Sequence, residues 1–239
     1  MTTFSLVIPC YNDAARLQQG VELLRDALTG TAVSWDFVFV EDHSRDDTAA
    51  ELERCVEWLQ SRGVTASAIY LDHNHGHGGA VSSGLRAARG EIVGYVELDP
   101  SLARGLVPMI ERVHRGAADI VVGRRVFAAP LAVPFRFLSY TIYRRYAFSC
   151  LRLPVSDPEC RLKVFRRSAL LPILDAVEDQ HCFWDTELLD RGRRGGLVIT
   201  EVPIAVKGDE RARGGPLLRT ARNYVRAMNR YRTTRQGTS

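Results

Sequence analysis

Apolar and polar residues alternate in blocks along the first hundred positions, which predicts alternating strands and helices. Short apolar runs rich in β-branched residues are typical of buried strands, whereas apolar residues spaced three and four apart mark one face of a helix. Strands are predicted at residues 5–9, 36–40, 66–71 and 92–96, and helices at residues 14–28, 48–62 and 77–88. This order predicts an α/β fold of the Rossmann-like kind, with a mainly parallel sheet flanked by helices.

The pattern becomes less regular in the second half of the chain. Further strands are predicted at residues 119–122, 162–165 and 197–203, with helices at residues 184–194 and, rich in aromatic residues, 135–151. The sequence shows no internal repeat, low-complexity tract or linker. We therefore expect one compact domain over residues 1–214, followed by an extension over residues 215–239.

Polar clusters directly follow three of the predicted strands. They are residues 9–13 (PCYND), the pair Glu41-Asp42, and residues 97–99 (ELD). Carboxyl ends of parallel strands meet at one edge of the sheet, and ligands bind beyond that edge. The clusters are therefore candidate parts of one site, although the acidic residues after the second strand could instead cap the next helix.

Glu97 and Asp99 form the sharper acidic pair. At a spacing of two residues on a strand, their side chains point to the same side. Carboxylate oxygens are the ligands that Mg²⁺ and Mn²⁺ prefer, so the pair could hold a divalent cation. The alternative is an acidic turn before Pro100.

Residues 74–80 (NHGHGGA) form a glycine-rich loop before a predicted helix. Such a loop can present backbone N–H groups to an anion, and Gly79 is the candidate within it. The spacing is not that of dinucleotide or P-loop motifs. His73, His75 and His77 also permit a metal interpretation, which we do not favour because an irregular loop fixes no common face.

Several basic residues lie at predicted strand ends, where they could bind phosphate groups or form a solvated charge cluster. They are Arg124, Arg125, Arg161, Lys163, Arg166 and Arg167.

Positive charge is concentrated at the C-terminus. The whole chain has a net charge of +4, but residues 207–239 carry +7 and the preceding residues −3. On a helical wheel, apolar residues of this segment, such as Met228 and Tyr231, lie opposite arginines such as Arg226 and Arg230. This pattern predicts either an interfacial helix on anionic lipid or a helix that docks on the domain.

Composition is that of a globular protein, with 46% hydrophobic and 25% charged residues. The five cysteines are scattered, which favours reduced thiols. The first residues lack the features of a signal peptide, and no apolar run approaches the roughly 18 residues that a spanning helix needs. We expect a cytoplasmic protein, with a peripheral position at the inner membrane face as an option.

Six segments in order resemble family 2 glycosyltransferases of the GT-A fold, and in particular the dolichol- or polyprenol-phosphate mannose synthases. The segments are VIPCYND, VEDHSRDDT, NHGHGGAVSSGLRAARGEIVGYVELDP, VGRR, PVSDPECRLKVFRRSAL and TEVPIAVKGDERARGG. The resemblance covers most of the chain, and six motifs in register make it specific.

The resemblance, together with the candidates above, assigns the expected site residues. Donor-binding residues would be Pro9, Tyr11, Asn12, Asp13, Glu41, Asp42, Gly79, Glu97, Leu98 and Asp99. Glu97 and Asp99 would bind the cation, Mg or Mn. Arg125, Lys163 and Arg211 would bind phosphate or acceptor groups, and Asp99, Asp157 and Glu187 are the expected catalytic residues.

Departures from the family pattern affect the metal site and the acceptor side. Glu97 replaces the first Asp of D-x-D, and Ser101 stands where the synthases have a further Gln ligand. The family's Gly-Phe-Arg becomes Arg161-Leu162-Lys163.

The resemblance implies inverting transfer of a hexosyl group from GDP-mannose or a UDP-sugar to a polyprenyl phosphate. A phosphate acceptor is already anionic and needs no general base. One alternative keeps the donor chemistry with a hydroxyl acceptor, for which Asp157 or Glu187 would be the base. Another is a non-catalytic protein that binds nucleotide or nucleic acid through its basic C-terminal segment.

Overall fold

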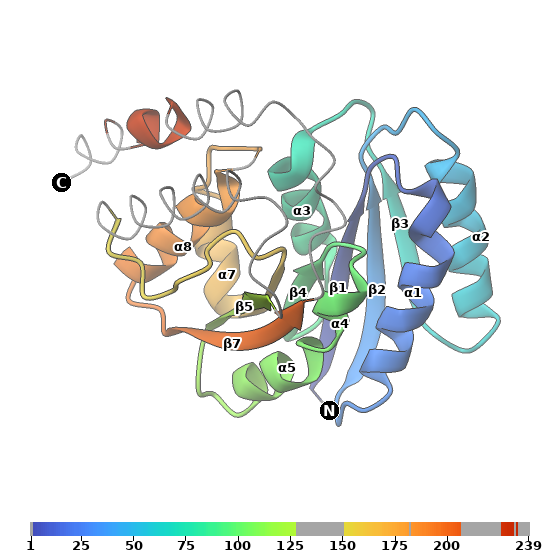
Figure 1. Ribbon diagram of the computed structural model, residues 1–239, viewed down its shortest axis with the longest axis horizontal. Helices are drawn as coiled ribbons and strands as arrows, with labels where there is room; N and C mark the ends of the chain where they lie inside the picture. Colours follow the sequence, from blue (N-terminus) through green and yellow to red (C-terminus); the bar gives the residue numbers. More distant parts are fainter. Residues whose placement is uncertain (1, 128–150, 182, 207–225, 232, 234–239) are drawn as a thin grey trace.

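The computed structural model describes residues 2–127, 151–181, 183–206, 226–231 and 233 (Figure 1). Its strands are β1 (Thr3–Cys10), β2 (Ser34–Glu41), β3 (Ala66–Tyr70), β4 (Ile92–Val96), β5 (Ile120–Phe127), β6 (Leu162–Arg166) and β7 (Ile199–Val206). Its helices are α1 (Ala14–Leu28), α2 (Thr48–Gln60), α3 (Gly76–Ala87), α4 (Pro100–Ala103), α5 (Leu106–His114), α7 (Arg167–Leu174) and α8 (Trp184–Arg194).

All these strands join one sheet in the order β3-β2-β1-β4-β6-β5-β7. β1, β2, β3 and β4 pair in parallel, as do β5 and β7, whereas β6 runs antiparallel to both of its neighbours. The predicted α/β fold with a mainly parallel sheet is therefore confirmed, with β6 as the exception.

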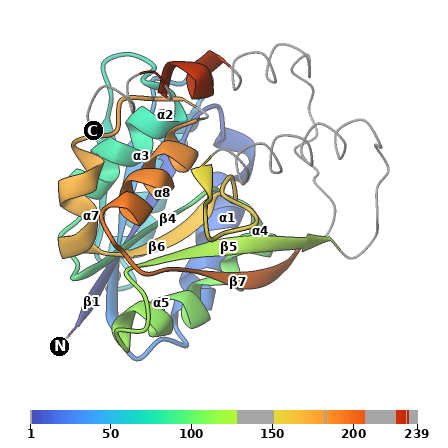
Figure 2. The ribbon, with the colours of Figure 1, turned by 90° about the vertical axis from the view of Figure 1, so that its left-hand side faces the viewer.

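Helices cover both faces of the sheet. α1 and α2 lie side by side on one face, where α4 and α5 also pack (Figure 1). α3, α7 and α8 lie together on the other face (Figure 2). Right-handed crossovers require this division, because the chain winds one way from β1 to β3 and then returns past β1 to form β4.

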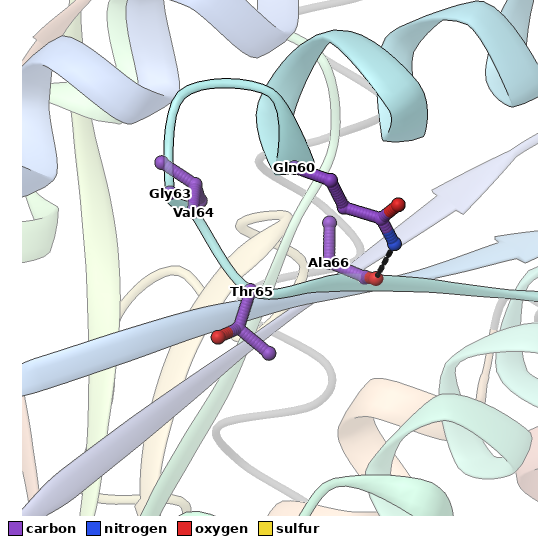
Figure 3. Close-up of a pocket in the computed structure, with 5 residues that line it drawn as sticks. All are labelled: Gln60, Gly63, Val64, Thr65 and Ala66. Atoms are coloured by element: carbon purple, nitrogen blue, oxygen red, sulfur yellow. Dashed lines mark hydrogen bonds between the residues drawn. The ribbon is translucent and has the colours of Figure 1, made fainter.

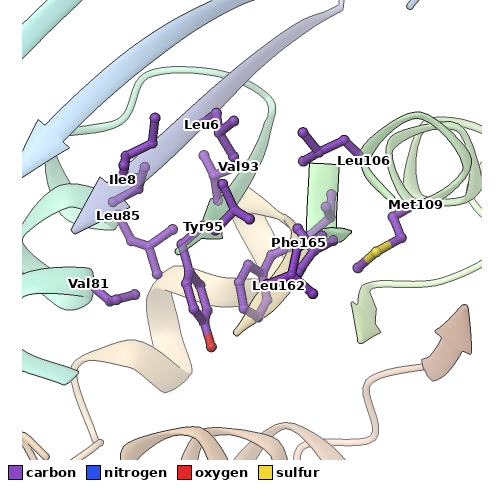
Figure 4. Packing of buried hydrophobic residues seen from close by; sticks show 14 of the residues in the cluster. Leu6, Ile8, Val81, Leu85, Val93, Tyr95, Leu106, Met109, Leu162 and Phe165 are labelled. Atoms are coloured by element: carbon purple, nitrogen blue, oxygen red, sulfur yellow. The ribbon is translucent and has the colours of Figure 1, made fainter. Parts of the chain in front are cut away.

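The central strands are buried on both faces, which explains their unbroken apolar runs. Leu6 of β1 faces α5, and Tyr95 of β4 faces α3, with both side chains fully buried (Figure 4). Phe165 of β6 stacks on Tyr95 at a ring distance of 6.4 Å. One continuous core thus joins the two halves of the sheet.

The sequence did not predict α4, α5 or α7. α4 has only four residues, too few for a periodic pattern. α5 does carry buried residues at helical spacing, Leu106, Met109, Ile110 and Val113, so its signal was present in the sequence. The helix predicted at residues 135–151 falls almost wholly outside the described residues.

Residues 226–231 are helical and pack on the domain. Met228 is fully buried, and the Tyr231 hydroxyl donates a hydrogen bond of 2.9 Å to Asp190 of α8. Arg226 and Arg230 are exposed. For these residues, the apolar face meets the protein and the arginines face outward, as expected of a docked helix.

Gly84 provides a test of how closely α3 approaches the sheet. A Cβ atom there would lie 2.3 Å from Cγ1 of Val7 and 2.8 Å from Cγ2 of Val40. We expect Gly84→Ala to lower the free energy of unfolding by roughly 1–3 kcal/mol, despite the better helix propensity of alanine. Gly30→Ala, with nothing within 4 Å of the added atom, is the matched control. Urea unfolding of both variants measures the difference; equal stabilities would contradict the packing described.

Candidate active site

The strand order reverses between β1 and β4, which is where open α/β sheets bind their ligands. A cleft of about 340 Å³ lies there, beyond the carboxyl ends of β1, β2 and β4. Its lining comprises Pro9, Cys10, Tyr11, Asp13, Arg16, Asp42, Asn74, Gly76, His77, Ala80 and Glu97. The cleft therefore brings together five of the expected donor-binding residues: Pro9, Tyr11, Asp13, Asp42 and Glu97.

Asp42 organises the glycine-rich loop. Its carboxylate accepts hydrogen bonds from the Asn74 side chain (3.0 Å) and from the backbone N–H groups of His75 (2.6 Å) and Gly76 (3.0 Å). Burial raises the pKa of Asp42, and the two backbone bonds from His75 and Gly76 oppose the rise. The first N–H groups of this loop are thus directed at Asp42.

Asn12 and Glu41 fix the neighbouring loops. Asn12 has a φ of 53°, its N–H donates to Ser44 Oγ at 3.0 Å, and its side-chain oxygen accepts from the Arg45 N–H at 2.9 Å. Glu41 accepts from the N–H groups of His43 (3.1 Å) and Ser44 (2.7 Å). Both residues therefore support the shape of the cleft without being part of its lining.

Three other expected donor residues also lie outside the lining. The Gly79 N–H donates to the Gln180 carbonyl at 3.1 Å. Leu98 is buried against α1, where a Cβ atom on Gly20 would meet it at 2.8 Å. The Asp99 carboxylate accepts the Ser101 N–H at 2.9 Å and so caps α4.

A buried polar network lies beneath Glu97. β4 and β6 are antiparallel, Tyr95 pairs with Lys163, and the Glu97 N–H donates to the Arg161 carbonyl at 3.1 Å. Alternation along the two strands therefore turns the side chains of Tyr95, Glu97, Arg161 and Lys163 toward α3 and α8.

Asp185, in the first turn of α8, is the fully buried centre of this network. It accepts hydrogen bonds from Lys163 Nζ (2.7 Å), Arg161 Nη1 (2.9 Å) and the Tyr95 hydroxyl. Burial alone would raise the pKa of Asp185, but the charges of Lys163 and Arg161 outweigh it and lower the pKa to about 2. Sequence reasoning missed Asp185, because nothing in its local pattern shows that two cations face it.

His77 joins the network to the cleft. Its Nδ1 lies 3.7 Å from Glu97 Oε1, and its Nε2 lies 3.8 Å from Asp185 Oδ2. Burial, followed by the charge of Arg161, lowers the pKa of His77 to about 4, against the opposing charges of Asp185 and Glu97. The imidazole is therefore neutral at physiological pH.

Four expected catalytic or phosphate-binding residues lie in ion pairs. Arg125 forms a two-bond pair with the buried Asp157, at 2.9 Å for each bond. Lys163 is fully buried. Glu187 accepts bonds from the N–H groups of residues 178 and 179 and pairs with Arg191 at 2.7 Å. The proposed roles of these residues stay predictions; Arg211 lies outside the described residues.

Two further features lie away from the cleft. A shallow hollow lined by Gln60 and residues 63–66 lies at the opposite end of the sheet, before β3, and none of these lining residues is charged (Figure 3). Asp72, His73 and His75 place ligand atoms within 4.8 Å of one another. The side chains of Asp72 and His73 are largely exposed, and this group does not include His77.

The sequence matches the model of glycosyl transferase family 2 over residues 5–173. Glycosyltransferase AglD of Haloferax volcanii is 31% identical over 217 residues, which is 86% of this chain and 33% of that protein. The dolichyl-phosphate beta-glucosyltransferase of Saccharomyces cerevisiae is 25% identical over 245 residues, or 92% of this chain and 72% of that protein. The chain thus spans about one third of the first relative and nearly three quarters of the second.

Solved structures show the same fold. Glucosyl-3-phosphoglycerate synthase from Mycobacterium tuberculosis, in complex with Mn²⁺, UDP and glucosyl-3-phosphoglycerate, superposes with a TM-score of 0.64 at 18% identity. The match covers 94% of this chain and 77% of that one. Fold and cleft thus define a GT-A nucleotide-sugar transferase architecture. The chain belongs to glycosyl transferase family 2 and is a glycosyltransferase, so the interpretation as a non-catalytic binding protein was wrong.

The neutral state of buried His77 predicts a pH dependence of stability. Its pKa is about 4 in the folded protein and near 6.5 in the unfolded chain, so the unfolded chain binds the extra proton between these values. The folded state should lose on the order of 3 kcal/mol as the pH falls from 6.5 to 4. Urea unfolding at pH 7 and 4.5 should show a smaller loss for His77→Gln than for the wild type. The exposed His114→Gln serves as control; parallel pH profiles for all three would contradict the burial of a neutral imidazole.

Proposed function

We propose that this glycosyltransferase transfers a hexosyl group from a nucleotide-diphosphate sugar, with GDP-mannose and UDP-sugars as candidate donors, to a polyprenyl phosphate. The observation that carries the donor half is the cleft at the strand-order switch, which Asp42 and Glu97 both line. A concave site beyond the carboxyl ends of parallel strands, with few polar groups that converge, suits a nucleotide.

Glu97 and Asp99 would hold a divalent cation, Mg or Mn. Glu97 fits this role because its side chain is 27% exposed and lines the cleft, and its carboxylate oxygens suit a hard cation. When bound, such a cation would neutralise charge on the diphosphate leaving group. The Mn²⁺ and UDP in the mycobacterial complex support this proposal through the shared fold.

The surroundings of the two carboxylates expected as alternative bases support a phosphate acceptor. A hydroxyl acceptor would need a general base. Asp157 and Glu187, the candidates for that role, accept hydrogen bonds from arginines and from backbone N–H groups, and their side chains are at most 2% exposed. The yeast relative also carries dolichyl phosphate in its name.

The reaction would be a single displacement with inversion at the anomeric carbon. An oxygen of the acceptor phosphate forms the new bond to the anomeric carbon. The bond from that carbon to the donor β-phosphate oxygen breaks, and its electron pair leaves with the nucleoside diphosphate. Catalysis by the protein would consist of positioning and of charge stabilisation around the leaving group.

A peripheral position at the inner membrane face, in the cytoplasm, would bring such a lipid acceptor within reach. No described helix is both long and apolar enough to cross a bilayer. Arg226 and Arg230 are exposed beside the docked Met228 and Tyr231, and positive charge on an exposed helix face attracts anionic lipid headgroups. Flotation with anionic liposomes tests this part, and protein that stays unbound would refute it.

Removal of the Glu97 carboxylate should abolish cation-dependent donor binding. We expect one nucleotide sugar, with Mn²⁺ or Mg²⁺, to raise the melting temperature of the wild type by several degrees. Glu97→Ala should lose this shift while it melts normally without ligand, and the exposed Glu57→Ala should keep it. A screen of GDP- and UDP-sugars by thermal shift identifies base and sugar together. An unchanged shift in Glu97→Ala would contradict the assigned role.

Transfer to the acceptor needs its own assay. The donor found by thermal shift is supplied in radiolabelled form, and we expect polyprenyl phosphate to become labelled. Glu97→Ala should lower the rate of this transfer at least about a hundredfold. If small-molecule alcohols become labelled and polyprenyl phosphate does not, the result would support a hydroxyl acceptor instead.

A further inference from the structure

We propose that His77 is a nitrogen ligand of the cation in the donor cleft, with its second ring nitrogen beside the carboxylate of Asp185. This inference rests on the proposed function, because it concerns the cation of that same site. It pairs Glu97, one of the two expected ligands, with a residue from the glycine-rich loop.

The distances suit a shared ion. Nδ1 of His77 and Oε1 of Glu97 are 3.7 Å apart, and both residues line the cleft. Two ligand atoms that each lie about 2.1 Å from one ion are roughly 3.0–3.4 Å apart in octahedral and tetrahedral sites. A closing movement of a few tenths of an ångström would therefore bring both atoms onto one cation. The present separation is too long for a hydrogen bond between them.

The other ring nitrogen explains the orientation of the lone pair. Within the described part of the chain, His77 Nε2 is buried without a hydrogen-bond partner, and Asp185 Oδ2 is 3.8 Å away. If Nε2 carries the proton, its N–H points at that carboxylate and the Nδ1 lone pair faces Glu97. Histidines that bind metals usually donate their second nitrogen to a carboxylate, and Asp185 is the carboxylate nearest to Nε2 here. With a cation bound at Glu97, Asp185, His77 and that cation would form a carboxylate–histidine–cation series.

The charges nearby predict when the cation binds. Arg161 Nε lies 3.7 Å from Glu97 Oε1, and Lys163 also pairs with Asp185. The two cations Arg161 and Lys163 face the two carboxylates Glu97 and Asp185 of this network. The protein alone should therefore attract a dication weakly, and the donor diphosphate should supply the missing negative charge. Cation and nucleotide are expected to bind together.

Other positions at the site offer fewer oxygen ligands than the family pattern. Ser101 replaces the further Gln ligand, and the Asp99 carboxylate accepts the Ser101 N–H at 2.9 Å. A nitrogen from His77 would offset this loss. Imidazole suits transition metals such as Mn²⁺ better than Mg²⁺, which prefers oxygen. The site should accordingly prefer Mn²⁺ to Mg²⁺.

Electron spin-echo spectroscopy of bound Mn²⁺ tests the ligand directly. Wild-type protein with Mn²⁺ and UDP or GDP should show coupling to a ¹⁴N nucleus, and His77→Gln should not. By calorimetry, His77→Gln should weaken nucleotide binding about tenfold or more in Mn²⁺ and less than about threefold in Mg²⁺, because the amide offers an oxygen. Melting temperatures without metal and nucleotide check the fold, and His77→Asn provides a second variant if His77→Gln is unstable.

His73→Gln is the matched control. His73 lies in the same loop, is largely exposed, and belongs to the surface group with Asp72 and His75. His73→Gln should keep both the ¹⁴N coupling and the wild-type affinities. That result would exclude the group of Asp72, His73 and His75 as the source of the coupling. If the wild-type protein binds nucleotide with Mn²⁺ but shows no ¹⁴N coupling, this inference is overturned and the proposed function is not. If neither UDP nor GDP binds, the proposed function falls and the inference with it.

Discussion

The ion pair between Lys163 and Asp185 is the constraint on which the site depends. Both side chains are fully buried, and desolvation of two charges is costly unless every hydrogen-bonding group finds a partner. Lys163 meets this condition with three acceptors: Asp185, the Tyr95 hydroxyl and the Cys160 carbonyl. The pair therefore holds α8, β4 and β6 in fixed positions beneath Glu97, and loss of either partner would leave an unpaired charge in the core.

The same helix connects the site to the C-terminal segment. Asp185 lies in the first turn of α8, and Asp190, further along it, accepts the hydrogen bond from Tyr231. The Tyr231 ring also lies 5.6 Å from that of Phe183, which precedes α8. The helix at residues 226–231 is therefore anchored at Phe183, two residues before Asp185, and at Asp190. A lipid phosphate attracted by its outward-facing arginines would approach the protein at this end.

The sequence predicted the fold and the meeting of the first polar clusters at one edge of the sheet, because local patterns determine both. Apolar runs marked the central strands, and polar residues at the strand ends had to meet at one edge, so Pro9, Asp42 and Glu97 could be assigned to one site before the structure was known. The basic and acidic residues of the second half were harder. Lys163 was expected at a phosphate, but its partner Asp185 is 22 residues away in the chain, and only the pairing of β6 with β4 brings them together. The charge of a residue alone does not show whether its side chain binds a phosphate or pairs with another side chain of the protein.

Two departures from the family pattern, Glu97 and Arg161, are neighbours in space. They face each other across β4 and β6, with Arg161 Nε 3.7 Å from Glu97 Oε1. Where the family pattern has glycine, Arg161 adds a positive charge beside the proposed cation site, which alone would weaken cation binding. Two features offset this effect. The extra methylene of Glu97 lengthens the reach of its carboxylate, and the bond from Arg161 to Asp185 neutralises the charge of the guanidinium. The two substitutions are therefore best understood as one coupled change, in which the carboxylate, the guanidinium and Asp185 share their charges.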